Sequence, residues 1–152
     1  MKLLLWHCQK IKYVDARLST RPEKVRQLSR SKTSATFNDV LVVLTCVEST
    51  DSQTHVDFAV EEIRRNLEMI GHQKHVVIMP FVHLSSNIAQ PQTAIDIIHR
   101  VTDSLERAGV TVSEGSFGFH KDFELHFKGY GHPGSVCFRS IPYTKGGAES
   151  DV

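Results

Sequence analysis

Continuous apolar runs occur twice in the chain and predict its central strands. The first is "DVLVVLTCVE" at residues 39–48, and the second is "KHVVIMP" at residues 74–80. Both are rich in β-branched residues and show no polar alternation. This is typical of strands that are covered on both faces, as in a parallel sheet flanked by helices.

Two further segments have apolar residues at helical spacing and predict amphipathic helices. The first covers residues 54–70, and Gly71 is a suitable C-terminal stop. The second covers residues 91–108 and is followed by Gly109. Pro91 suits the first turn of a helix, where its missing N–H costs nothing.

The remaining apolar segments are short and predict the outer strands. They lie at residues 2–8, 10–14, 110–113, 122–128 and 135–141. The last two flank the glycine-rich stretch "KGYGHPG", so we expect them to pair as an antiparallel hairpin. The chain is therefore predicted to be a single α/β domain, with a mixed β-sheet packed against two main amphipathic helices.

The segment of residues 15–38 has no sustained period and predicts a long loop, with one helical turn after Pro22. The charge of the chain is uneven here. Residues 1–38 hold nine Lys or Arg against two acidic residues, although the whole chain has a net charge of only +1. Such a segment is either a solvated loop or a surface that meets phosphates, and charge alone favours the loop.

The length and composition indicate one globular domain. The chain has 152 residues, 40% of them hydrophobic, and no apolar stretch approaches the roughly 20 residues needed to cross a bilayer. We expect the domain to cover residues 1–143, and residues 144–152 to form a disordered tail or linker.

The N-terminus is typical of a strand and not of a signal peptide. The three scattered cysteines indicate no disulfide framework. A cytoplasmic protein without a membrane partner is expected.

The candidate chemistry lies in two clusters. The nine histidines match no metal-ligand spacing, and neither a G-x-S-x-G elbow nor a phosphate-binding loop is present. What remains is "PFVHLSS" at residues 80–86, which carries His83, and "SFGFHK" at residues 116–121, which carries His120 and Lys121. Singly, each is best explained as a turn. Together they offer a positive charge for an oxyanion or phosphate and two hydrogen-bonding imidazoles.

At these clusters the sequence resembles the archaeal threonyl-tRNA synthetase N-terminal editing domain, which shares the D-aminoacyl-tRNA deacylase fold. The matching segments follow one another in the same order across nearly all of residues 1–142. They are "LLLWH", "VLVVLTCVE", "PFVHLSS", "QPQTAIDIIHRV", "FGFHK" and "KG…HP".

The resemblance implies a proofreading deacylase that hydrolyses L-serine from the 3′ end of threonine tRNA. A missing methyl group supplies only ~1–3 kcal/mol of discrimination, so a second sieve must remove the wrong product. The ribose 2′-hydroxyl is expected to position the attacking water, and no metal or other cofactor is implied. Family members tend to form homodimers. The implied partners are the serine-charged tRNA and a second copy of the chain, and a separate aminoacylating threonyl-tRNA synthetase is a further candidate.

The resemblance also implies roles for particular residues. Lys121 would orient the terminal adenosine and stabilise charge, while His83 and His120 line the site. Close-packed walls at Val47 and Val82 would exclude the extra methyl group of threonine. The substrate-binding set implied by the resemblance is Val47, Pro80, Phe81, Val82, Phe117, Gly118 and Phe119.

The sequence departs from the family pattern in two places. Phe119 and His120 stand where tyrosines are common, and Gly134, Ser135 and Val136 occupy the stretch where a carboxylate often follows the "KGHP" turn. Two alternatives stay open. One is a D-aminoacyl-tRNA deacylase, although the signature Gly-Pro pair is absent from the sequence. The other is a non-catalytic tRNA-binding appendage of a synthetase.

Overall fold

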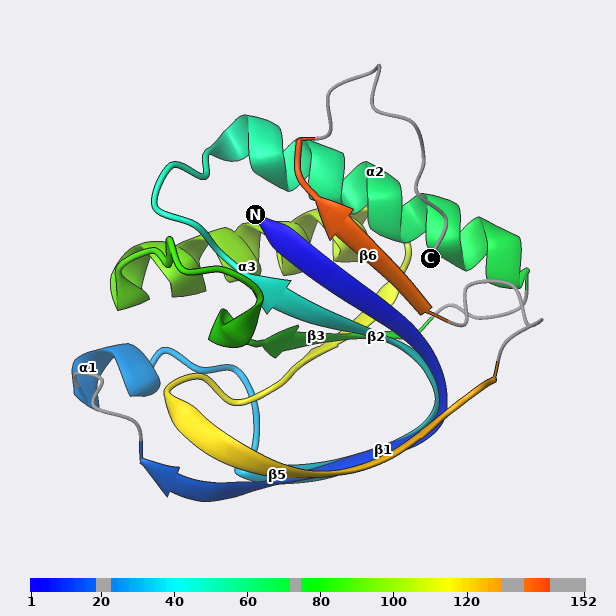
Figure 1. Cartoon of the computed structure of the whole chain (residues 1–152), viewed down its shortest axis with the longest axis horizontal. Helices are drawn as coiled ribbons and strands as arrows, with labels where there is room; N and C mark the ends of the chain where they lie inside the picture. Colours follow the sequence, from blue (N-terminus) through cyan, green and yellow to red (C-terminus); the bar gives the residue numbers. More distant parts are fainter. Residues whose placement is uncertain (19–22, 72–74, 130–135, 143–152) are drawn as a thin grey trace.

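The computed structural model describes residues 1–18, 23–71, 75–129 and 136–142, and these form one mixed α/β domain (Figure 1). A six-stranded sheet has the order β4-β3-β2-β1-β5, with β6 also paired to β1. The elements are β1 (Lys2–Leu18), α1 (Glu23–Arg26), β2 (Ser34–Cys46), α2 (Gln53–Ile70), β3 (His75–Pro80), the 3-10 helix η1 (Val82–Leu84), α3 (Pro91–Arg107), β4 (Thr111–Glu114), β5 (Phe119–Phe127) and β6 (Val136–Ser140). The predicted fold class, a single α/β domain with a mixed β-sheet packed against two main amphipathic helices, is confirmed.

Both faces of the central sheet are buried, as the continuous apolar runs predict. Strands β2, β3 and β4 are parallel, and β1 runs antiparallel to its neighbours. Helices α2 and α3 cover one face, where one core cluster includes Leu41 and Val43. The sheet curves so that β5 and the second half of β1 lie on the side away from these helices (Figure 1). That curve encloses a second core cluster, which includes Val42 and Val77.

The two amphipathic helices are confirmed, with the expected residues at their ends. Pro91 is the first residue of α3. Gly71 and Gly109 follow α2 and α3 with φ of 85° and 83°, a conformation that favours glycine. No helix of the described residues is long and apolar enough to cross a membrane.

The predicted hairpin between the last two strands is wrong. Strand β6 pairs with the first part of β1, in the register Leu4 to Phe138, while β5 pairs with the second part, in the register Tyr13 to Phe123. This is possible because β1 is one 17-residue strand instead of the two short ones predicted. Its register shift after Cys8 bends it, so one curved edge serves two partners.

The predicted loop at residues 15–38 is wrong at its two ends. Residues 15–18 continue β1, and residues 34–38 begin β2, so the two strands extend their antiparallel pairing to Val14 and Ser34. The expected helical turn is α1, which is anchored by the buried Val25. The predicted tail, residues 144–152, lies outside the described residues, so the expected domain limits stay a prediction.

Candidate functional site

An open pocket of about 540 Å³ lies where the C-terminal end of β3 meets the start of β5. Three segments line it: residues 80–83, residues 117–121 with Phe123, and the end of β1 at Arg17 and Leu18. The ends of parallel strands are the usual place for ligands in α/β sheets. The pocket therefore lies where the order of the sheet predicts a site.

The β3 side of the pocket is held by the neighbouring parallel strand. Beyond Pro80, the backbone N–H of Phe81 donates to the carbonyl oxygen of Thr45 at 2.8 Å. The Cys46 thiol lies 3.6 Å from the carbonyl oxygen of Val82. The rings of Phe81 and His83 then meet edge to face, with centroids 5.0 Å apart. These contacts explain why "PFVHLSS" turns sharply after the buried strand.

The β5 side begins with a turn that is fastened at two points. The Ser116 hydroxyl donates a short hydrogen bond to Asp15 of β1. The Phe117 N–H donates to the Ser29 hydroxyl at 3.1 Å. Gly118 has a φ of 85°, which explains the glycine between the two aromatic residues.

Lys121 lines the pocket, and its surroundings shift the pKa of its ammonium group. Burial lowers its pKa to about 8, against the opposing influence of the negative charge of Asp15. Its Nζ donates to the carbonyl oxygen of Phe119 at 3.2 Å. A desolvated ammonium of this kind stabilises developing negative charge far better than a solvated one.

The two candidate histidines occupy the rim. The side chains of His83 and His120 are both exposed, on η1 and β5 respectively. His120 is the cross-strand partner of Arg17. Both imidazoles can therefore reach a ligand in the pocket, and neither is enclosed by protein.

A smaller hollow adjoins the pocket and shares four of its lining residues, Pro80, Phe81, Val82 and Phe117. Its volume is about 30 Å³, and Val47, Ala94 and Ile98 complete its apolar wall. A space of this size accepts a group of about one or two waters. It is polar at Thr45, whose hydroxyl donates to the Val43 carbonyl oxygen at 3.1 Å.

The ten residues singled out from the sequence thus come together. Nine of them line the pocket, and Val47 lines the hollow beside it. In the described part of the chain, no three His, Cys, Asp or Glu side chains are grouped so as to hold a metal ion.

A family model for the Archaea-specific editing domain of threonyl-tRNA synthetase matches residues 1–141. The chain belongs to this family. Similar proteins include the threonine–tRNA ligases of Nanoarchaeum equitans, Staphylothermus marinus and Pyrococcus horikoshii. Their identities are 32%, 33% and 33%, and the matches cover 93%, 97% and 100% of this chain. They cover only 22%, 23% and 24% of the relatives, so this chain spans less than a quarter of their length.

A solved structure, the c-Myc DNA Unwinding Element Binding Protein, is similar with a TM-score of 0.68. The match covers 94% of this chain and all of that one, at 12% sequence identity. At this identity the similarity shows the fold alone.

The pocket of this editing domain also contains residues that the sequence did not single out. Arg17, Leu18 and Phe123 line it, and Asp15 binds Ser116, the residue just before the lining segment 117–121. For Arg17 and Leu18, the sequence signal was the strand pattern that continues from residues 10–14 to the end of β1. It was hidden by the Ser- and Lys-rich composition that follows.

Proposed function

We propose that this chain is a proofreading deacylase that hydrolyses L-serine from threonine tRNA. The observation that most supports the proposal is the position of Lys121, a largely desolvated ammonium on the wall of a pocket with a small polar-edged hollow beside it. A solvated lysine in a surface turn would be equally consistent with a non-catalytic appendage.

In the proposed reaction, water attacks the ester carbonyl of the seryl group. The water oxygen bonds to the carbonyl carbon, the bond from that carbon to the ribose 3′ oxygen breaks, and the leaving oxygen takes a proton. The neighbouring 2′-hydroxyl holds the water, so the substrate supplies part of the mechanism. Lys121 stabilises the oxyanion and orients the terminal adenosine, while His83 and His120 border the nucleotide from the rim.

The hollow is the proposed seat of the serine side chain. Its hydroxymethyl group fits a space of about 30 Å³, and the hydroxyl can pair with Thr45. Threonine carries one further methyl group against the buried Val47, and overfilling a packed wall costs about 1–3 kcal/mol. Val82, which is 45% exposed, also lines the hollow. Backbone groups at these two residues and at Phe117 and Gly118 bind the amino group of the substrate.

The proposed macromolecular partner is the 3′ end of threonine tRNA, in the cytoplasm, with aminoacylation carried out by a synthetase core. Arg17 at the pocket and the exposed Lys24 of α1 carry positive charge suited to phosphates. Such contacts predict binding that weakens as salt concentration rises.

We also propose a homodimer that covers the apolar face of β1, β5 and β6. Phe123, Phe127, Val136 and Phe138 are 40–52% exposed on these strands, and Phe127 stacks on Trp6. Exposed large apolar side chains on strands that pair with the same β1 support a protein interface. Light scattering should give a dimer mass for the wild type and a monomer mass for Phe138→Glu. A single-chain mass for the wild type would contradict the dimer.

The deciding experiment is a deacylation assay on threonine tRNA charged with L-serine, L-threonine or D-serine, with EDTA present throughout. We expect fast loss of L-serine and slow loss of the other two. Fast loss of D-serine would point to a D-aminoacyl-tRNA deacylase. Binding of tRNA without turnover of any ester would leave a tRNA-binding appendage and overturn the proposal.

A further inference from the structure

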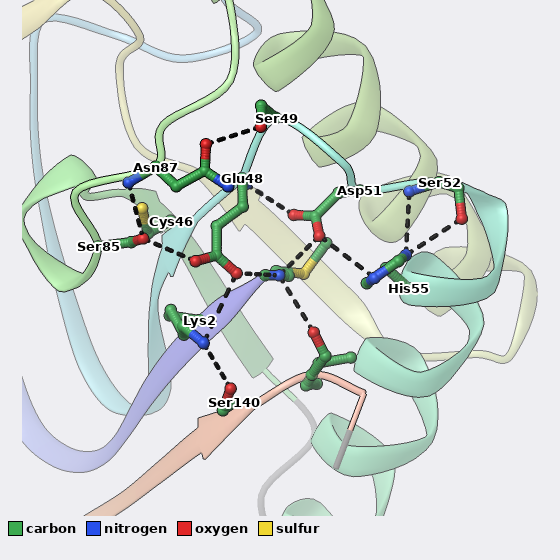
Figure 2. Close-up of polar contacts among 12 residues, drawn as sticks. Lys2, Cys46, Glu48, Ser49, Asp51, Ser52, His55, Ser85, Asn87 and Ser140 are labelled. Atoms are coloured by element: carbon green, nitrogen blue, oxygen red, sulfur yellow. Dashed lines mark hydrogen bonds and ion pairs between the residues drawn. The ribbon is translucent and has the colours of Figure 1, made fainter. Parts of the chain in front are cut away.

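A polar network joins four separate segments of the chain around Glu48 (Figure 2). The α-ammonium of Met1 donates to Glu48 at 2.8 Å, to Asp51 at 2.6 Å and to the carbonyl oxygen of Ile141 at 3.2 Å. The Lys2 ammonium lies 3.7 Å from the same Glu48 carboxylate. One carboxylate thus connects the start of β1 with the segment between β2 and α2.

The second oxygen of Glu48 binds the segment that follows η1. Its Oε1 accepts a hydrogen bond from the Ser85 hydroxyl at 2.6 Å, and that hydroxyl accepts from the Asn87 N–H at 3.1 Å. Ser85 directly follows η1, which carries Val82 and His83. The two ends of the Glu48 carboxylate therefore join the anchored N-terminus to the segment that forms the pocket wall (Figure 2).

Further bonds tie the same two segments together around Glu48. The N–H of Ser49 donates to the Asn87 carbonyl oxygen at 3.2 Å, and the Ser49 hydroxyl donates to the Asn87 side chain at 2.7 Å. The N–H of Ala89 donates to the carbonyl oxygen of Val47 at 3.0 Å. Val47 directly precedes Glu48 in the chain, and Val82 lies three residues before Ser85. The Glu48–Ser85 bond therefore joins the two segments that carry these lining residues of the hollow.

We propose that Glu48 is a positioning residue for substrate selection: through Ser85 it holds residues 81–89 against residues 47–49, and this sets the width of the hollow between Val47 and Val82. The inference rests on the proposed proofreading function. A sieve that rejects one methyl group needs walls that cannot yield by a few tenths of an ångström. Residues 82, 83 and 86–88 are exposed, and residue 85 is only half-buried. Core packing alone therefore does not hold this segment rigid.

The electrostatics of the network favour the charged form of Glu48. Burial raises the pKa of its carboxyl, but hydrogen bonds from the Met1 ammonium and from Ser85 outweigh this and hold the pKa below its usual range. Hydrogen bonds to an ionised acceptor are roughly twice as strong as neutral ones. The Ser85 bond is accordingly suited to hold the rim.

The test compares Ser85→Ala with Ser86→Ala. Ser85→Ala removes the hydroxyl that meets Glu48, whereas Ser86→Ala removes a neighbouring hydroxyl whose side chain is exposed. Ser85→Thr keeps the hydroxyl and should rescue the function. A second pair is Glu48→Gln against Asp51→Asn. Asp51 also binds the Met1 ammonium at 2.6 Å and accepts from the Glu48 N–H at 2.7 Å, which an asparagine can still do through its amide oxygen, but it is not bonded to Ser85.

Two measurements are made on each variant, at a temperature where all are folded. The first is the ratio of kcat/KM for L-seryl- and L-threonyl-tRNA. The second is amide hydrogen exchange of residues 81–89. We expect Ser85→Ala and Glu48→Gln to lower the ratio on the order of tenfold or more and to speed exchange of this segment. Ser86→Ala, Asp51→Asn and Ser85→Thr should keep the wild-type ratio.

The outcomes separate the inference from the proposed function. An active wild type with an unchanged ratio in Ser85→Ala and Glu48→Gln would overturn the inference and leave the deacylase intact. A wild type without turnover would overturn the proposed function, and with it the selectivity part of the inference. Hydrogen exchange would then still decide whether Glu48 holds the rim, and equal exchange in all variants would reject that too.

Discussion

Asp15 of β1 and Lys121 of β5 are direct cross-strand partners, so a carboxylate and an ammonium from distant parts of the chain share one stretch of the sheet. The Asp15 carboxylate is oriented by the Ser116 hydroxyl, and its Oδ2 is buried. Gly134, Ser135 and Val136 carry no carboxylate. Asp15 supplies a carboxylate near Lys121 from another strand.

The first prediction concerns pH. Burial lowers the pKa of Lys121 to about 8 and Asp15 acts in the opposite direction, so the ammonium is lost as the pH rises through about 8. We expect kcat/KM for L-seryl-tRNA, after subtraction of enzyme-free hydrolysis, to fall over that range. Removing the negative charge in Asp15→Asn disfavours the ammonium further and should move the fall to lower pH. Asp122→Asn, at an exposed neighbouring position, should leave the profile in place. A shift to higher pH in Asp15→Asn would contradict the assignment.

The second prediction concerns the charge of Lys121 itself. Lys121→Met keeps the length of the side chain but removes the ammonium, and we expect kcat to drop by about 10²–10³, the range for loss of one oxyanion-stabilising group. Thermal stability should be kept, because a buried apolar chain carries no desolvation cost. Lys10→Met, which changes an exposed lysine outside the pocket, should deacylate normally. Activity in Lys121→Met equal to that of Lys10→Met would remove Lys121 from the mechanism.

The third prediction concerns the size of the hollow. Val47→Ala enlarges the space of about 30 Å³, so threonine should enter and the preference for L-serine should fall by about tenfold or more. The variant also loses buried methyl groups, at a cost of about 1–3 kcal/mol in the free energy of unfolding. Val56→Ala, at a fully buried position of α2, controls for that loss and should keep the preference. Equal preferences in the two variants would count against the hollow as the serine seat.

The fourth prediction concerns the attachment of β6 to α2. Glu62 of α2 is 1% exposed, and its Oε1 accepts from Arg139 of β6 at 2.8 Å and from Asn66 at 3.1 Å. Arg139→Ala removes one charged donor from a buried carboxylate, so the free energy of unfolding should fall by about 1–3 kcal/mol. Urea denaturation measures this change. Arg64→Ala, on the exposed side of the same helix, should change it by no more than about 0.5 kcal/mol.

The sequence by itself determined the elements whose signals are local. Helical spacing and end residues placed α2 and α3 because a helix is stabilised by contacts within a few residues. Continuous apolar runs placed β2 and β3 because both of their faces are buried. The motif that carries Val82 and His83 could be predicted in the same way, since it lies at the end of β3. The role of Lys121 came from the resemblance to the family.

Only the tertiary structure decided which strands pair and what completes the pocket. Strand pairing joins residues far apart in the chain, and the curve of β1 gave β5 and β6 separate stretches of one edge. Asp15 meets Lys121 through this pairing, and Glu48 meets Met1 and Ser85 through contacts that span 47 and 37 positions. Such contacts leave no local pattern, because they depend on how the sheet bends and not on the residues beside them.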